Sequence, residues 1–293
     1  MSACAWIDAK QRELIYRPTP GTMAQWQEVS GHDEAIWLDL PRGSGSGSGA
    51  EQGERVRAIW IPQPSLGAPA VLYLHGTFRN VFQNRSKIAA IHAAGFSVLA
   101  VDYRGWGEST TRLPSEASIM QDAERTFTEF ARRVPQPNRR VIYGHSMGTG
   151  VAVELASRHR QPDEYGALVL ESAFTSLPDI ARDRGGVARW FAWASTQHFK
   201  SLDKIDGIDT PKWFITGAND NTVPTRQSQR LYEAARDPRH IVVFPGGSHS
   251  SLHEDDPQRY HAVWRDVAAA LRADAPSAPL QASGAASVPA AQP

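Results

Sequence analysis

The feature that most constrains this chain is a succession of short apolar segments separated by helical patterns. Six of these segments are apolar almost without interruption, which is typical of strands that are buried on both faces of a sheet. They are Ala70–His75, Ser97–Val101, Arg140–Tyr143, Leu168–Glu171, Lys212–Thr216 and Ile241–Phe244. Because helical patterns lie between such strands, the sequence predicts βαβ units and an α/β fold with a mostly parallel sheet and helices on both faces.

The clearest of the helical patterns runs over Ser118–Val134, where apolar residues recur on one face. Ser118 and Gln121 are predicted to form a capping box at its start. Val151–Arg158 and Gln227–Ala235 are predicted to be shorter helices.

Two earlier segments, Ala35–Leu40 and Val56–Ile61, differ from the others because apolar and polar residues alternate along them. The Gly/Ser-rich segment 42–49 lies between them. Alternating strands joined by a flexible tip predict an N-terminal antiparallel hairpin at the edge of the sheet. An interdomain linker is the alternative, although residues 1–40 are too few to bury a core of their own.

The composition excludes several classes of protein. The 293 residues include 31 basic and 31 acidic side chains, and this balance argues against nucleic-acid binding through a basic face. Apolar residues make up 41% of the chain, which excludes a mainly disordered protein. The single cysteine, Cys4, excludes an internal disulfide framework and a cysteine-rich zinc site. We expect neither a metal nor a cofactor.

The two ends of the chain give separate expectations. Charged residues interrupt the N-terminus, so the sequence as it stands predicts a cytoplasmic protein. A membrane-anchored lipoprotein is the alternative if the true start lies upstream, because small residues precede Cys4 as they precede a lipidated cysteine. We expect residues 1–30 to form an N-terminal segment, 31–272 the folded domain and 273–293 a disordered Ala/Pro-rich tail.

A nucleophile motif follows the predicted strand Arg140–Tyr143. Residues 144–148 are Gly-His-Ser-Met-Gly, a G-x-S-x-G pattern between a strand and an Ala/Val-rich helix. In this setting the serine stands on a strained turn, and the two glycines let strand and helix approach closely. The helix N-terminus then directs its N–H groups toward the reacting centre. Ser146 is therefore the predicted nucleophile, and a glycine-rich turn that only tightens the junction is the alternative.

A serine nucleophile needs a base and a carboxylate that orients the base. His249 follows the last predicted strand, at the same sheet edge as Ser146, and is the predicted base. His253 is the alternative, expected instead to open the terminal helix and to face solvent. Asp220 lies in the loop after the preceding strand and is the predicted acid, with Glu171 as the alternative.

Acyl transfer also needs N–H donors that stabilise the oxyanion of the transition state. One predicted donor is the backbone N–H of Met147, directly after the nucleophile. The other is the backbone N–H of Thr77, in the loop that follows the strand Ala70–His75. His75 is expected to be structural, hydrogen-bonded within its loop, and His145 is expected to pack.

In their order along the chain, these motifs resemble the α/β-hydrolase superfamily of serine hydrolases, over about residues 55–272. The resemblance is carried by the His75-Gly76 loop and by residues 101–109, 144–148, 171–177, 217–224 and 245–249. The segment 171–177 resembles the small-lid subgroup, which includes depalmitoylase-like and lysophospholipase-like enzymes and many uncharacterised bacterial hydrolases. The resemblance implies a Ser146, Asp220 and His249 triad, with Thr77 and Met147 as oxyanion donors.

Two loops depart from the family's pattern. The segment before Asp220 begins with Thr-Gly rather than His-Gly, which leaves the acid assignment in place. The first loop is His-Gly-Thr-Phe-Arg-Asn rather than the commoner His-Gly-Asn, which changes the polarity expected near the oxyanion donors. Arg79 and Asn80 in this loop are expected to hold it, with contact to substrate as the alternative. The segment 102–104 is expected to be a structural turn.

Residues 172–211 form an unusually long connection between two predicted strands. We expect a small helical lid over the catalytic edge of the sheet. Its aromatic residues either wall an acyl pocket or pack the insert onto the body of the protein; they are Trp190, Phe191, Trp193 and Phe199.

These residues together predict a serine hydrolase that cleaves carboxylic ester or thioester bonds of a small-molecule or lipid acyl substrate. A peptidase of the prolyl-peptidase type and a non-catalytic binding protein that retains the fold are the alternatives. Membrane association is expected only if Cys4 is lipidated.

Overall fold

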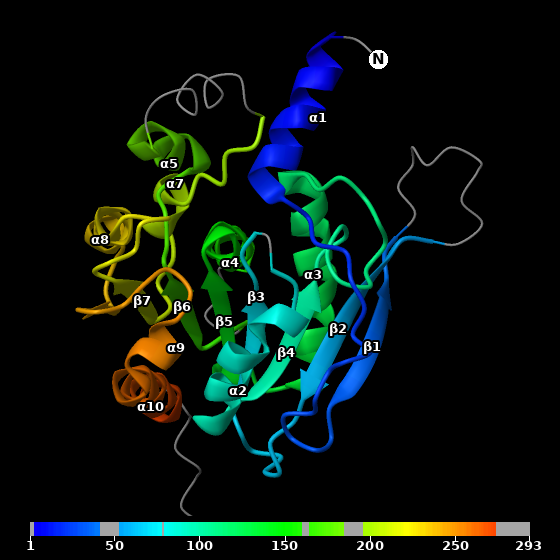
Figure 1. Cartoon of the computed structure of the whole chain (residues 1–293). Helices are drawn as coiled ribbons and strands as arrows, with labels where there is room; N and C mark the ends of the chain where they lie inside the picture. The colour runs from blue at the N-terminus through cyan, green and yellow to red at the C-terminus, as the bar shows by residue number, and fades with distance from the viewer. Residues whose placement is uncertain (1–2, 42–52, 78, 160–163, 185–195, 274–293) are drawn as a thin grey trace, which may run out of the picture.

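The computed structural model describes residues 3–41, 53–77, 79–159, 164–184 and 196–273. Within them, strands form one sheet in the order β1-β2-β4-β3-β5-β6-β7-β8 (Figure 1). The strands are β1 (Glu34–Asp39), β2 (Arg55–Ile61), β3 (Ala70–Leu74), β4 (Ser97–Asp102), β5 (Arg140–His145), β6 (Ala167–Glu171), β7 (Lys212–Gly217) and β8 (Arg239–Phe244). All the predicted strands are confirmed, because each observed strand begins and ends within two residues of its predicted bounds.

The sheet changes from antiparallel to parallel at β4. β1 pairs with β2, and β2 with β4, in the antiparallel sense, whereas β3 to β8 pair with their neighbours in parallel. The first pair runs from Glu34 opposite Trp60 to Asp39 opposite Arg55, with β1 at the edge of the sheet. This pairing confirms the edge hairpin. Its predicted Gly/Ser tip, 42–49, lies outside the described residues.

Helices cover both faces of the sheet, as predicted (Figure 1). Residues of β3 alternate between two apolar clusters, since Leu72 belongs to one and Val71 to the other. The Leu72 cluster includes α3 (Glu116–Arg133), α4 (Met147–Arg158) and α8 (Thr225–Ala234). The Val71 cluster includes α2 (Arg85–Ala93) and α10 (Pro257–Ala273). The central strands are therefore buried on both faces, which explains their uninterrupted apolar sequences.

The cap of α3 corrects one prediction. Ser115 has an extended backbone, and its side chain accepts a hydrogen bond from the Ser118 N–H at 3.1 Å. The Ser118 hydroxyl accepts in turn from the Ser115 N–H at 2.9 Å, so these two serines form the capping box. The predicted box of Ser118 and Gln121 is wrong, because the helix begins at Glu116 and the Gln121 side chain accepts from Arg104 instead.

The start of the chain forms α1 (Ala3–Tyr16), a helix that is not among those predicted from the sequence. The Tyr16 hydroxyl is buried and donates to Gln197 Oε1 at 2.6 Å, and Thr196 donates to Asp8 at 3.0 Å. These contacts join α1 to the long connection between β6 and β7. No helix in the described ranges has the length and apolar character needed to cross a membrane.

The β6–β7 connection contains α5 (Leu177–Arg184) and α7 (Leu202–Ile205). Of the four aromatic residues that the sequence singles out in it, Phe199 is described, and it is buried against α4. A Cβ atom added to Gly150 would lie 2.8 Å from Phe199 Cβ, so this ring packs the insert onto the body of the protein. Trp190, Phe191 and Trp193 lie outside the described residues, as does the tail beyond Ala273.

Candidate active site

The loops at the carboxyl ends of β3, β5, β7 and β8 bring the predicted site residues to one edge of the sheet. Thr77 follows β3, Ser146 joins β5 to α4, Asp220 follows β7 and His249 follows β8. In a parallel sheet the carboxyl ends of the strands share an edge, where ligands of open α/β sheets bind. The fold itself therefore gathers residues that are far apart in the sequence.

The turn at Ser146 is strained. Its backbone has φ 53° and ψ −122°, a conformation that a residue with a side chain rarely adopts. A Cβ atom added to Gly148 would lie 2.0 Å from the Leu74 carbonyl oxygen, and one added to Gly144 would lie 2.3 Å from the Gly148 carbonyl oxygen. Both glycines are therefore required for strand and helix to approach this closely. The resulting turn places Ser146 at the head of α4.

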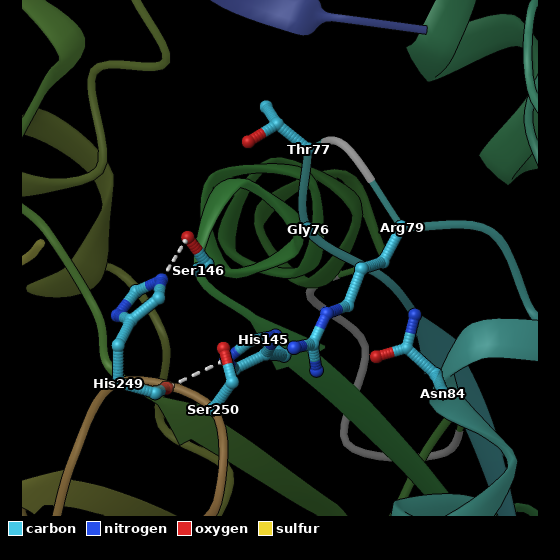
Figure 2. Close-up of a pocket in the computed structure, with 8 residues that line it drawn as sticks. All are labelled: Gly76, Thr77, Arg79, Asn84, His145, Ser146, His249 and Ser250. Atoms are coloured by element: carbon cyan, nitrogen blue, oxygen red, sulfur yellow. Dashed lines mark hydrogen bonds between the residues drawn. The ribbon is translucent and has the colours of Figure 1, made fainter. Parts of the chain in front are cut away.

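A continuous chain of hydrogen bonds joins Ser146, His249 and Asp220. Figure 2 shows the hydrogen bond between His249 and Ser146, in which His249 Nε2 and Ser146 Oγ are 3.0 Å apart. His249 Nδ1 lies 2.8 Å from Asp220 Oδ2. The other carboxylate oxygen, Asp220 Oδ1, accepts from the N–H groups of Thr222 and Val223, each at 2.8 Å. The structure thus brings together the three residues that were predicted as nucleophile, base and acid.

The environment of Asp220 keeps its carboxylate charged. Burial by itself raises the pKa of this group, but the hydrogen bonds from His249, Val223 and Thr222 outweigh burial and lower the pKa below its ordinary value. An ionised carboxylate on the Nδ1 side stabilises a positive charge on the imidazole. His249 is therefore arranged to accept a proton on Nε2.

The predicted oxyanion donors lie close to the same serine. Thr77 and Ser146 line one small pocket (Figure 2). A Cβ atom added to Gly76 would lie 3.1 Å from Ser146 Cβ. Met147 is the first residue of α4, where backbone N–H groups have no acceptor within the helix. Donation by Thr77 and Met147 to an oxyanion stays a prediction.

His75 and His145 each form a hydrogen bond with a backbone carbonyl oxygen of a loop at the site. His75 is buried, with Nδ1 at 2.6 Å from the Gly76 carbonyl oxygen, which confirms its place within the loop. His145 Nε2 lies 2.9 Å from the His249 carbonyl oxygen, so this nitrogen carries the proton and donates. Burial, with the positive charge of Lys87 nearby, holds the pKa of His145 well below its ordinary value. A neutral His145 therefore supports the loop that carries the base.

His253 does not face solvent, which corrects that expectation. It lies in a separate short helix, α9 (Leu252–Asp255), because Pro257 begins the terminal helix α10. Its ring is buried, and Nε2 lies 3.0 Å from the Ser86 hydroxyl. The alternative base is thus directed toward α2, whereas His249 meets the nucleophile.

The alternative acid, Glu171, is also engaged elsewhere. Its buried carboxylate forms an ion pair with Lys87 and accepts hydrogen bonds from Tyr143 at 2.7 Å and Tyr260 at 3.2 Å. Sequence reasoning missed Lys87. The available signal was its position in α2 on the same helix face as Ile91, four residues later.

The segment 102–104 is a structural turn, as expected. Asp102 Oδ1 accepts from the Val81 N–H at 2.7 Å, and Arg104 forms an ion pair with Asp122 at 2.7 Å. Asn80 also holds its loop, because its side-chain oxygen accepts from the Gln83 N–H at 3.0 Å.

The chain is similar to several known proteins. A family model described as serine aminopeptidase, S33, matches residues 68–204. An uncharacterized protein of Mycobacterium tuberculosis is 33% identical over 253 residues, which covers 84% of this chain and 82% of that protein. The lysophosphatidylserine lipase ABHD12 of Danio rerio is 29% identical over 228 residues, covering 71% of this chain and 57% of the lipase. A solved esterase of Pyrococcus furiosus has a TM-score of 0.65 at 18% identity, and the match covers 85% of this chain and 96% of the esterase.

Proposed function

This chain belongs to the α/β-hydrolase superfamily, and from that premise we propose that it is a serine hydrolase of carboxylic esters or thioesters. The observation that carries the proposal is the hydrogen-bonded chain from Ser146 Oγ through His249 to Asp220. A strained turn that presents the serine at a helix N-terminus supports the same chemistry.

In the first half of the reaction, Ser146 Oγ attacks the carbonyl carbon while its proton passes to His249 Nε2. Asp220 holds the imidazole and stabilises its charged form. The N–H groups of Thr77 and Met147 stabilise the tetrahedral oxyanion. His249 then gives the proton to the departing alcohol or thiol, which leaves an acyl group on Ser146.

In the second half, water replaces the alcohol. His249 takes a proton from the water as its oxygen attacks the acyl carbon, and a second oxyanion forms in the same position. Collapse of this intermediate breaks the bond to Ser146 Oγ, which regains the proton from His249. The products are a carboxylic acid and the free enzyme.

We further propose a small-molecule or lipid acyl substrate. The similarity to a protein named as a lysophosphatidylserine lipase supports an ester, and the fold shared with an esterase agrees with it. In this proposal residues 31–272 form the catalytic domain, and the insert 172–211 acts as its lid.

Hydrolysis of peptides is the second candidate. The description of the matching family model, serine aminopeptidase, favours it, and the same triad serves amide and ester substrates. A panel of aminoacyl amides compared with acyl esters separates the two candidates.

The proposal is tested with p-nitrophenyl esters from acetate to palmitate, using wild type and Ser146→Ala. Ser157→Ala removes a hydroxyl from the same helix and is the matched control. This hydroxyl donates to the Glu154 carbonyl oxygen and takes no part in the hydrogen-bonded chain of Ser146, His249 and Asp220. We expect Ser146→Ala to lose at least about 10³-fold in kcat, and the control to keep its activity. Full turnover by Ser146→Ala would contradict the proposal. A maximum at short chains indicates a carboxylesterase, and a maximum at long chains indicates lipid or acyl-thioester substrates.

A further inference from the structure

Arg79 brings a positive charge into the pocket beside the nucleophile. Figure 2 shows its side chain extending from the Thr77 loop toward the side of the pocket formed by His145 and Ser250. The described residues that line this pocket contribute one guanidinium and no carboxylate; they are Gly76, Thr77, Arg79, Asn84, His145, Ser146, His249 and Ser250. The pocket next to Ser146 is therefore positively charged.

Arg79 forms no ion pair with any described residue, whereas the neighbouring cations have protein partners. Lys87 forms an ion pair with Glu171, and Arg104 pairs with Asp122. Arg85 donates to the Gln27 carbonyl oxygen at 2.6 Å. Arg79 is exposed and makes no hydrogen bond or ion pair with any described residue. Its N–H donors are thus available to a molecule in the pocket.

The electrostatic influence of Arg79 reaches the residues that surround the nucleophile. The pKa of His145 is lowered first by burial and further by the charges of Lys87, His249 and Arg79. Glu171 forms an ion pair with Lys87, so of these two cations Arg79 is the one without a described carboxylate partner. An arginine that only fixed its loop would instead be expected to donate to nearby carbonyl or carboxylate oxygens.

We propose that Arg79 binds an anionic group of the substrate, so that the enzyme prefers esters that carry a carboxylate or phosphate near the scissile bond. This inference rests on the proposed esterase function and names its substrate class. The planar guanidinium presents N–H donors in a fixed fork that matches carboxylate and phosphate oxygens. Ser250 and Asn84 line the same pocket and add polar surface for such a group.

Two pairs of esters test this preference. Phenyl acetate and p-acetoxybenzenesulfonate differ by a charge on the leaving group, and p-nitrophenyl hexanoate and mono-p-nitrophenyl adipate differ by a charge on the acyl group. For each pair, the ratio of kcat/KM for the anionic ester to kcat/KM for the neutral ester is measured in wild type, Arg79→Gln and Arg79→Lys. Arg265→Gln, at an exposed arginine of α10, is the matched control.

We expect the ratio to fall about tenfold in Arg79→Gln for at least one pair, the size of one charge-assisted hydrogen bond at a partly screened site. The pair whose ratio falls shows whether Arg79 binds an anion on the leaving group or on the acyl group of the substrate. Arg79→Lys keeps part of the preference because it keeps the charge but loses the fork. The control keeps the wild-type ratio, and added salt lowers that ratio in wild type. Competition by benzoate and by phenyl phosphate, measured in wild type and Arg79→Gln, identifies the preferred anion.

The inference is overturned if both ratios are the same in wild type and Arg79→Gln while the neutral esters are cleaved. If wild type cleaves none of the four esters, the proposed function fails instead. Since Arg79 is exposed, its replacement is not expected to change the melting temperature, and this is checked for every variant.

Discussion

Replacement of Asp220 by asparagine tests whether Asp220 determines which nitrogen of His249 carries the proton. Asp220 Oδ1 is held by the N–H groups of Thr222 and Val223, so it must remain an oxygen in Asp220→Asn. The amide NH₂ then occupies the position 2.8 Å from His249 Nδ1 and donates to it. This donation fixes the proton on Nε2, which faces Ser146 Oγ at 3.0 Å and can no longer accept the serine proton.

The magnitude follows from the groups that would be left without partners. Turning the amide to restore the active tautomer would direct NH₂ at two N–H donors, at about 1–3 kcal/mol for each buried group left unsatisfied. Loss of the carboxylate that stabilises the imidazolium adds to this cost. We therefore expect kcat to fall by about 10³–10⁴-fold, or about 4–5.5 kcal/mol at 1.36 kcal/mol per factor of ten.

The assay is steady-state hydrolysis of a p-nitrophenyl ester, with the melting temperature as a check on folding. Asp266→Asn makes the same chemical change at an exposed aspartate of α10 and is expected to keep wild-type kcat. A folded Asp220→Asn enzyme with more than about a tenth of wild-type kcat would refute the reasoning about the tautomer.

Two further changes test the scaffold. Gly148→Ala places a methyl group 2.0 Å from the Leu74 carbonyl oxygen, so we expect a loss of activity and of about 3 kcal/mol in unfolding free energy. Gly53→Ala, with no atom within 4 Å of the added Cβ, is its control, and equal stability of the two variants in urea would contradict the prediction. Burial raises the pKa of Asp102 from 3.8 to about 7. Between these two values the folded state holds a proton that the unfolded state releases, so Asp102 lowers the free energy of unfolding as pH rises toward 7. Between pH 5 and pH 8 the wild type should lose about 3 kcal/mol more than Asp102→Asn in urea unfolding; equal losses would show that Asp102 is not the titrating group.

Most of the fold could be predicted because its signals are local. Strands buried on both faces are apolar throughout, and this signal alone placed the central strands. Helix starts were harder. In 115–118 the N-cap Ser115 and the third helical residue, Ser118, accept hydrogen bonds from each other's backbone N–H groups. The Ser118 hydroxyl takes the place of the Glu or Gln side chain that a capping box usually has, so the pattern does not identify Ser115 as the cap. α1 makes hydrogen bonds with residues 196 and 197, which are far away in the sequence. A local sequence pattern does not predict such long-range contacts.

The catalytic residues could be predicted because their positions follow from the order of the strands along the chain. Ser146, Asp220 and His249 each follow a parallel strand, so topology brings them together. Burial of polar side chains could not be predicted in the same way. Glu171 follows the same topology, yet its carboxylate is bound by Lys87, which approaches from a helix on one face of the sheet. His253 is buried because Pro257 separates α9 from α10, and that break was not recognised.

The most direct test of the proposed mechanism is to identify the residue that becomes acylated during turnover. Wild-type enzyme is mixed with a p-nitrophenyl ester, quenched in acid within the first turnovers, digested and analysed by mass spectrometry. We expect the added acyl mass on the peptide that contains Ser146, and no such adduct in Ser146→Ala. An acyl group on another residue, or turnover without any acylated peptide under conditions that trap a control serine esterase, would contradict the mechanism.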